Sequence, residues 1–343
     1  MCIGLIVLSS DPSAPVLVLN NRDEFYARPT STLARVQYEL IDSASDQREV
    51  SIFCGRDLER GGTWFGATPH STESVPQGER GTRFGFLTNY REVQSASSEG
   101  APSRGDAILG WLQSKDSPED YLAGLDLSVH NGLNLVIGWV GPDALPRVYV
   151  TSNRGTSTAN LSSFEPCSCG PKGATYTVRA RVSPDERMCF AVSNGPLGAP
   201  WPKVLRLEML VTRAMGNLGG SNDDEALFDA MRDTSSFEIE APLPACLQAT
   251  GVGEAIERAL GAVFIEPTSL VGQVYGTRST TLLRIGSGGL PVHMQERTYH
   301  LHEEGDGRSD GRQEAEEENK AAVVPGLRVS ETILRSKESS FLS

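Results

Sequence analysis

The sequence lacks an apolar run long enough to cross a lipid bilayer. A membrane-spanning helix needs about 20 mainly apolar residues, whereas candidate runs such as Leu133 to Val140 are short and contain Asn or Gly. The apolar segment from Cys2 to Leu8 has no basic region before it and meets Asp11-Pro12 too soon for a secretory signal. We therefore expect a protein that is neither an integral membrane protein nor secreted, with a buried strand at residues 2–8.

Basic residues are scarce as well. The chain has 31 Lys and Arg against 44 Asp and Glu, which gives a formal net charge of −13. Nucleic-acid backbones and anionic membrane surfaces favour clustered Lys and Arg, so we expect no nucleic-acid partner. The 343 residues are 38% hydrophobic and 22% charged, a composition typical of globular proteins with a sizeable core.

Cysteine and histidine are too sparse for a disulfide scaffold or an obvious metal site. The six cysteines are at positions 2, 54, 167, 169, 189 and 246, and only Cys167 and Cys169 lie close in sequence. Such usage suits a reducing compartment. A zinc site usually needs four Cys or His ligands at recognisable spacing, and none of the five histidines lies near the Cys167-Ser168-Cys169 pair. We therefore predict no metal site and no required cofactor.

Apolar runs separated by turn residues predict several strands. We expect strands at Cys2–Leu8, Val16–Asn20, Gly61–Gly66, Gly85–Asn89, Asn134–Val140, Arg147–Thr151, Cys189–Ser193, Thr280–Ile285 and Arg297–His302. A turn at residues 9–13 would join the first two strands into a hairpin. The polar segment 69–83 is interpreted as a loop insertion.

Helical signals lie between these strands. Capping residues precede short helices at Ala107–Leu112 and after Ser117-Pro118. Further helices are expected after Pro202, with a stripe of Val204, Leu207, Val211 and Met215, then after Asn222, with Leu227 and Met231 on one face, and at Ala255–Leu260. The order lacks the regular alternation of a doubly wound sheet. We therefore predict an α+β fold in which helices flank two mainly antiparallel sheets.

The C-terminal part differs in composition from the rest. Residues 303–320 contain eight acidic and three basic residues and nothing aromatic or β-branched. Such a segment cannot bury enough apolar surface to offset its ordering entropy. We predict one domain at residues 1–302, an acidic disordered segment at 303–322, and a tail at 323–343 that forms an appended helix.

Cys2 is the first candidate for chemistry. Removal of Met1 would leave its thiol and a free α-amino group on one residue, with reference pKa values of about 8.5 and 7.7–8.0. The amine could then accept the thiol proton and activate the nucleophile. The alternative is a small apolar residue in a core strand.

A charged run follows the second predicted strand. The expected hairpin returns Arg22 and Asp23 beside the start of the chain. Arg22 could lower the pKa of the thiol, and Asp23 could orient the amine or hold Arg22. The same residues could instead form a solvated turn with a surface ion pair.

The chain resembles a known family in five ordered sequence blocks. They are Met1-Cys2 with Asn21-Arg22-Asp23-Glu24-Phe25-Tyr26-x-Arg28-Pro29, Gly61-Gly62-Thr63-Trp64-Phe65-Gly66, Leu87-Thr88-Asn89-Tyr90, Ser193-Asn194 with Pro200-Trp201-x-Lys203, and Tyr275-Gly276-Thr277-Arg278-Ser279-Thr280. These blocks resemble the NRDE family, also called the transport and Golgi organisation protein 2 family. The resemblance implies roles in Golgi organisation and secretion, haem mobilisation, or lipid and acyl-coenzyme A homeostasis, in a cytosolic protein with Golgi or mitochondrial associations.

A more remote resemblance connects the chain to cysteine N-terminal-nucleophile (Ntn) hydrolases, which share an αββα sandwich. It implies Cys2, Arg22, Asp23, Asn89 and Asn194 as catalytic residues, with both asparagines donating hydrogen bonds to an oxyanion. Asparagine after a strand is also a common turn residue.

Four further residues are candidate substrate-binding residues. Arg278 could clamp a carboxylate or phosphate, or pair with Asp23. Trp64 and Trp201 could line an apolar pocket, or could pack in the core, and Tyr90 is the fourth candidate. The sequence thus predicts a pocket around Cys2 for haem, an acyl-coenzyme A or an amide. The protein would act there either as a carrier or as an amidohydrolase or thioesterase, and haem would be a cargo.

Overall fold

The computed structural model describes residues 2–9, 15–41, 47–70, 81–92, 100–141, 145–160, 162–181, 187–217, 224–236, 244–248, 250–301 and 327–336. Within these residues the chain forms two sheets. The first has the strand order β11 (Met188–Val192), β1 (Cys2–Leu8), β2 (Val16–Phe25), β13 (Gln273–Ile285), β14 (Val292–Leu301) and β15 (Leu327–Arg335), with the short strand β12 (Thr268–Leu270) beside β13. Its strand pairings are antiparallel.

The second sheet contains the strands of the middle of the chain. Its order is β3 (Thr30–Ile41), β4 (Gln47–Asp57), β5 (Phe65–His70), β6 (Gly81–Asn89), β7 (Leu133–Val140), β8 (Arg147–Ser152), β10 (Tyr176–Ala180) and β9 (Phe164–Pro166). These pairings are also antiparallel. The predicted α+β class with two mainly antiparallel sheets is therefore confirmed.

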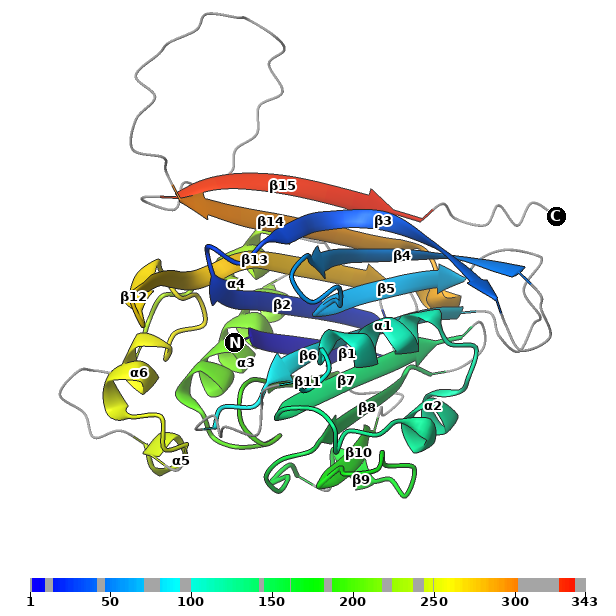
Figure 1. The fold of residues 1–343 in the computed structure, drawn as a ribbon, viewed down its shortest axis with the longest axis horizontal. Helices are drawn as coiled ribbons and strands as arrows, with labels where there is room; N and C mark the ends of the chain where they lie inside the picture. Colours follow the sequence, from blue (N-terminus) through cyan, green and yellow to red (C-terminus); the bar gives the residue numbers. More distant parts are fainter. Residues whose placement is uncertain are drawn as a thin grey trace, which may run out of the picture.

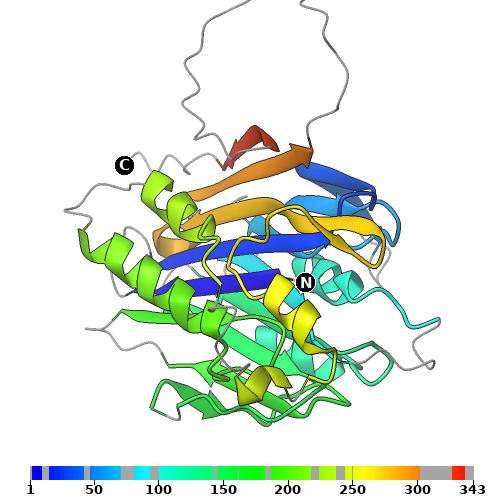
Figure 2. The ribbon, with the colours of Figure 1, turned by 90° about the vertical axis from the view of Figure 1, so that its left-hand side faces the viewer.

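Helices cover the outer faces of the two sheets (Figure 1). The helices α1 (Gly105–Gln113) and α2 (Pro118–Gly124) pack on the second sheet. On the first sheet lie α3 (Pro202–Asn217) and α4 (Asp224–Met231), as Figure 2 shows from the side. The short helices α5 (Ala245–Gln248) and α6 (Glu254–Ala259) follow in the chain. The layers are thus helix, sheet, sheet and helix.

The first strand shows how the sequence produces these layers. Ile6 and Leu8 belong to the apolar cluster between the sheets, whereas Ile3, Leu5 and Val7 belong to the cluster beneath α3 and α4. Side chains alternate between the two faces of a strand. A strand that is buried on both faces therefore has a continuous apolar sequence. Cys2 shares the alternation of Ile6 and Leu8, so its side chain faces the space between the sheets.

A glycine on this same face lets the sheets approach closely. A Cβ atom at Gly4 would lie 2.4 Å from the Phe86 ring of β6. Any side chain at Gly4 would therefore push the two sheets apart. The close approach brings the end of β6 near the start of β1, where Cys2 lies.

The second strand is longer than the sequence predicted. We expected it to end at Asn20, but β2 continues to Phe25, so Asn21-Arg22-Asp23-Glu24 lies within the strand. Charged residues are unfavourable in a buried strand unless they find partners. Those partners come from segments more than 200 residues away, such as the Met231 and Val263 carbonyls that accept hydrogen bonds from Asn21. The alternative of a solvated turn is therefore wrong.

Other boundaries also differ. The strands β3 and β4 were not predicted, because they are rich in polar residues and β3 has an exposed face. The predicted strand at 61–66 begins only at Phe65. The expected insertion at 69–83 is shorter, since β5 extends to residue 70 and β6 begins at residue 81, and residues 71–80 lie outside the described part.

The predicted helices are present. In α2, the Ser117 side chain accepts a hydrogen bond from the Asp120 N–H, as the capping pattern indicated. Ahead of α1 the capping differs, because Arg104 occupies the N-cap position without a side-chain cap. The proposed cap at residue 222 and the turn at 10–13 lie outside the described residues.

The predicted C-terminal helix is wrong for residues 327–335. They form β15, which pairs with β14 from Leu327 opposite Leu301 to Arg335 opposite His293. The alternation of Leu327, Val329 and Ile333 suits a strand, and the strand covers the edge of β14. The acidic segment 303–322 lies outside the described residues.

Two further findings concern cysteines and membranes. Cys167 and Cys169, the one pair that lies close in sequence, form a disulfide, although the cysteine usage was interpreted as suited to a reducing compartment. Cys2, Cys54, Cys189 and Cys246 are free thiols. Among the described residues, no helix has the length and apolar character that a membrane span requires.

Candidate active site

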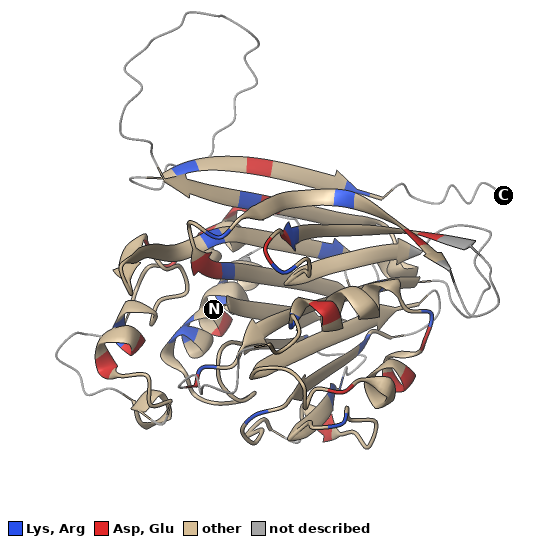
Figure 3. Cartoon of the chain, in the orientation of Figure 1, with Lys and Arg blue, Asp and Glu red and all other residues tan. Residues whose placement is uncertain are grey.

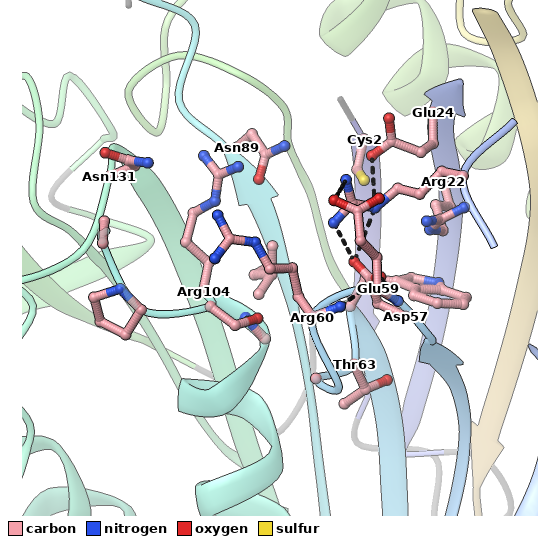
Figure 4. Close-up of a pocket in the computed structure, with 18 of the residues that line it drawn as sticks. Cys2, Arg22, Glu24, Asp57, Glu59, Arg60, Thr63, Asn89, Arg104 and Asn131 are labelled. Atoms are coloured by element: carbon pink, nitrogen blue, oxygen red, sulfur yellow. Dashed lines mark hydrogen bonds and ion pairs between the residues drawn. The ribbon is translucent and has the colours of Figure 1, made fainter. Parts of the chain in front are cut away.

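A cavity of about 300 Å³ lies beside the start of β1 (Figure 4). Its lining comes from both sheets and from the loops around residues 57–64 and 101–105. Charged residues dominate it, with four arginines and four carboxylates: Arg22, Arg28, Arg60, Arg104, Asp23, Glu24, Asp57 and Glu59. Figure 3 shows acidic and basic residues close together near the N-terminus, where the cavity lies.

Cys2 lines this cavity and is only 5% exposed. It pairs across the strands with Arg22, and the Ser193 hydroxyl donates a hydrogen bond to its carbonyl at 3.2 Å. Burial raises the pKa of the thiol above its ordinary value, whereas Arg22 and a hydrogen bond from the Asp23 backbone N–H act in the opposite direction. The thiol is therefore held mainly protonated near neutral pH, so it needs a base to become a nucleophile.

Arg22 lies on the same face of the sheet as Cys2. Its guanidinium stacks on the Trp64 ring, with 4.4 Å from Cζ to the ring centroid. Arg22 is 4% exposed, and its Nη1 atom has no hydrogen-bond partner among the described residues. A buried guanidinium with an unused donor is costly, and the buried Glu296 carboxylate interacts with its positive charge.

Asp23 turns toward the helices instead. Side chains alternate along β2, and the Thr277 hydroxyl of β13 donates a hydrogen bond to Asp23 Oδ1 at 2.7 Å. Burial raises the pKa of Asp23, while the Lys203 ammonium lowers it. The sequence placed Arg22 and Asp23 together beside Cys2, and the structure places both in the cavity lining but on opposite faces of the strand.

The two asparagines have different surroundings. Asn89 ends β6 and lines the cavity. Asn194 is fully buried, and its amide donates a hydrogen bond to the Asn89 carbonyl at 2.7 Å. Its Oδ1 accepts from Arg91 and Lys203, each at 3.4 Å. Asn194 therefore fixes the backbone that carries Asn89, and the oxyanion role of each remains a prediction.

A buried charge network lies behind Cys2. Arg91 forms an ion pair with Glu257 and stacks on Trp201 at 4.9 Å. Lys203 is 3% exposed, and burial together with Arg91 lowers its pKa to about 8, an effect that Asp23 and Cys2 oppose. The network thus keeps a second proton-exchanging group with a pKa near neutral close to the candidate nucleophile.

The low pKa of Lys203 predicts a pH dependence of stability. An unfolded lysine has a pKa of about 10.4, so folding is penalised below pH 8 and the penalty is relieved as the pH rises from about 8 to about 10.4. We compare the Cys2→Ala variant, which keeps Lys203, with the double variant that also carries Lys203→Met. Over this pH range the free energy of unfolding of the first should rise relative to that of the second. Denaturant titrations at several pH values would measure the difference, and a constant difference would contradict the prediction.

The remaining predicted residues lie outside the cavity lining. Arg278 donates hydrogen bonds to the backbone carbonyls of Phe25 and Tyr26 at 2.8 and 3.0 Å. Arg278 thus holds the backbone after β2 and is not part of the cavity lining, and its role as a substrate clamp stays a prediction. Trp201 is 3% exposed and packs in the cluster beneath α3 and α4. Tyr90 lies beside Gly155, away from the lining.

Sequence reasoning missed several residues of the site. Lys203 was part of a matching block, and its position on the apolar stripe of α3 was a signal of burial. Arg104 precedes a predicted helix, and Arg60 lies in a polar turn, so neither could be assigned to the cavity. Glu257 carried no signal, because its partner Arg91 is 166 positions away. No group of three or more His, Cys, Asp or Glu suited to a metal ion occurs in the described ranges.

Comparison with known proteins places the chain in a family. Residues 1–301 match the family described as Transport and Golgi organisation 2. No curated protein sequence matches the chain. The family match covers most of the chain, including every residue that lines the cavity. The chain therefore belongs to the Transport and Golgi organisation 2 family.

Proposed function

We propose that the chain hydrolyses an amide or thioester, with Cys2 as the nucleophile after removal of Met1. The observation that supports this proposal most strongly is the position of Cys2. It is a free thiol at the start of the first strand, and it lines a polar cavity on the same sheet face as Arg22. The raised pKa of the thiol makes a neighbouring base necessary. The α-amine that Met1 removal would create on Cys2 itself is such a base.

The reaction balances with these groups. The Cys2 sulfur attacks the carbonyl carbon while the thiol proton passes to the α-amine. That proton then moves to the departing amine or thiol, which leaves an acyl thioester on Cys2. Water hydrolyses this thioester, releases a carboxylic acid and restores the thiol. Asn89, the predicted oxyanion residue that lines the cavity, would donate a hydrogen bond to the oxyanion, a contribution worth about 3–4 kcal/mol in other enzymes.

A pair of N-terminal forms tests this proposal. One form begins at Cys2, and the other carries one additional residue before it, which turns the base into an amide nitrogen. We expect a β-lactone probe, whose ring opens on attack, to acylate Cys2 in the first form only. Intact mass and peptide mapping would detect the adduct. Retention of Met1 in the native protein, or equal labelling of both forms, would rule out the mechanism.

The buried amide of Asn194 favours a second candidate function. Because this amide already donates to the Asn89 carbonyl and Asn194 does not line the cavity, one of the two predicted oxyanion donors is directed away from a bound ligand. Loss of that donor weakens stabilisation of an oxyanion more than binding of a carbonyl compound. The chain would then carry an acyl-coenzyme A or haem, with Cys2 as a soft ligand for haem iron, in keeping with the transport role in the family's name.

A further inference from the structure

The carboxylates of the cavity are already paired. Arg28 forms ion pairs with Asp57 at 2.7 Å, Glu59 at 3.3 Å and Glu24 at 3.8 Å. One arginine thus neutralises part of the charge of three carboxylates on one wall. Asp23 is held on the far side of β2 by Thr277 and Lys203. The other arginines of the lining are left without these acids.

Two of these arginines extend toward the same part of the cavity. Figure 4 shows the Arg60 and Arg104 side chains converging beside Asn89, opposite Cys2. Neither side chain forms an ion pair with a carboxylate in the described part of the chain, and Arg104 donates one hydrogen bond to the Gly132 carbonyl at 3.2 Å. Burial lowers the pKa of Arg104, and the electrostatic interaction with Cys2 is the largest influence that opposes this shift. Arg104 and Cys2 therefore act on the same space.

Arg22 adds a third guanidinium to the lining. It is buried and stacked on Trp64, and the buried Glu296 carboxylate interacts with its charge. Arg60 and Arg104 have no ion-pair partner among the described residues, and two like charges that converge on one space are unfavourable without an anion. Because neither arginine forms an ion pair that would hold the fold together, we interpret the two side chains as serving a ligand rather than the fold.

We infer that the ligand of this cavity carries an anionic group, a carboxylate or phosphate, which Arg60 and Arg104 bind beside the Cys2 thiol. As a statement about a substrate, the inference rests on the proposed function. Planar guanidinium groups bind both anions through paired hydrogen bonds. The substrate is then an amide or thioester with a negatively charged group, not a neutral one.

Protection of Cys2 from alkylation tests the anion site without any turnover. Iodoacetamide is neutral, and mapping of the modified peptides separates Cys2 from the internal controls Cys189 and Cys246, which lie outside the cavity. We expect adipate or inorganic phosphate to slow modification of Cys2, and neutral hexanamide to have no such effect. Comparison of adipate with phosphate identifies the preferred anion.

Arginine variants complete the test. The quantity to compare is the anion concentration that halves the rate of Cys2 modification. Arg104→Gln, and Arg60→Gln at the more exposed position, should each raise this concentration by about 10-fold. The matched control Arg147→Gln, half-buried and paired with Glu119 away from the cavity, should leave it unchanged. The inference would be overturned if anions gave no protection, if only hexanamide protected Cys2, or if both cavity variants were protected as well as the wild-type protein.

The rate of hydrolysis separates this inference from the proposed function. We expect adipoyl p-nitroanilide to be cleaved with a higher kcat/KM than hexanoyl p-nitroanilide, and the ratio to fall in Arg104→Gln. Cleavage of both at equal rates would refute the anionic substrate and leave the nucleophile in place. Arginine-dependent protection without acylation of Cys2 would establish the anion site and refute the hydrolase.

Discussion

Replacing Cys2 with alanine should reduce hydrolysis of an anionic acyl anilide to the background rate, a loss of about 10³-fold or more, as for nucleophile removal in other enzymes. Alanine is small enough for Met1 removal to continue, so the α-amine is kept and only the sulfur is lost. Because the side chain is buried at the end of a strand, the change also removes little packing. The expected result is therefore a folded, inactive protein.

The same variant separates a hydrolase from a carrier. Titration of Cys2→Ala with a long-chain acyl-coenzyme A and with haem should show saturable binding if the cavity holds ligands without breaking a bond. Cys54→Ala is the matched control, because Cys54 is a free, buried thiol outside the cavity lining. It should keep the full hydrolysis rate. Wild-type protein that binds acyl-coenzyme A but never cleaves an acyl bond would support the carrier alone.

The sequence predicted those parts of the fold in which local pattern and burial agree. The first strand is apolar at every position, and α3 repeats Val204, Leu207 and Val211 on one face. The first pattern predicts a strand buried on both faces, and the second predicts an amphipathic helix. Both segments belong to the cluster that fixes the helix layer on the first sheet. Periodicity was sufficient there because the partners of these residues are simply other apolar side chains.

The strand segments that were missed are rich in polar residues, and several of these depend on distant partners. In β2 the polar residues are stabilised by groups that no local pattern reveals, such as Thr277 for Asp23 and the Met231 carbonyl for Asn21. In β3 the alternation of Val36, Tyr38 and Leu40 was a usable signal, because these residues pack against the α1 side of the second sheet. The polar residues between them obscured it.

The candidate site divides in the same way. Cys2 and Arg22 could be brought together from the hairpin alone, because antiparallel pairing fixes which residues are opposite. The different surroundings of Asn89 and Asn194 could not be predicted from the sequence, since they depend on which hydrogen bonds each amide already makes. Arg60 and Arg104 come from two loops whose approach is set by the packing of the whole sandwich.

The buried ion pair between Arg91 and Glu257 provides the largest expected effect on stability. Their side chains are 3% and 0% exposed, and Thr250 also donates a hydrogen bond to Glu257 at 2.5 Å. Removal of one partner leaves an uncompensated buried charge, which typically costs about 3–5 kcal/mol. We therefore expect Arg91→Met to lower the free energy of unfolding by this amount in denaturant titrations.

Two further variants decide whether the buried charge is the cause. The exposed pair of Arg154 and Glu92 is 39% and 36% accessible, so Arg154→Met should cost no more than about 1 kcal/mol. The double variant Arg91→Met with Glu257→Leu removes both charges and should recover much of the lost stability. If the double variant is as unstable as the single one, the loss comes from packing against Trp201 and not from the orphaned carboxylate. Recovery would show that the network behind Cys2 is kept for the electrostatics of the site, because an apolar pair would hold the fold equally well.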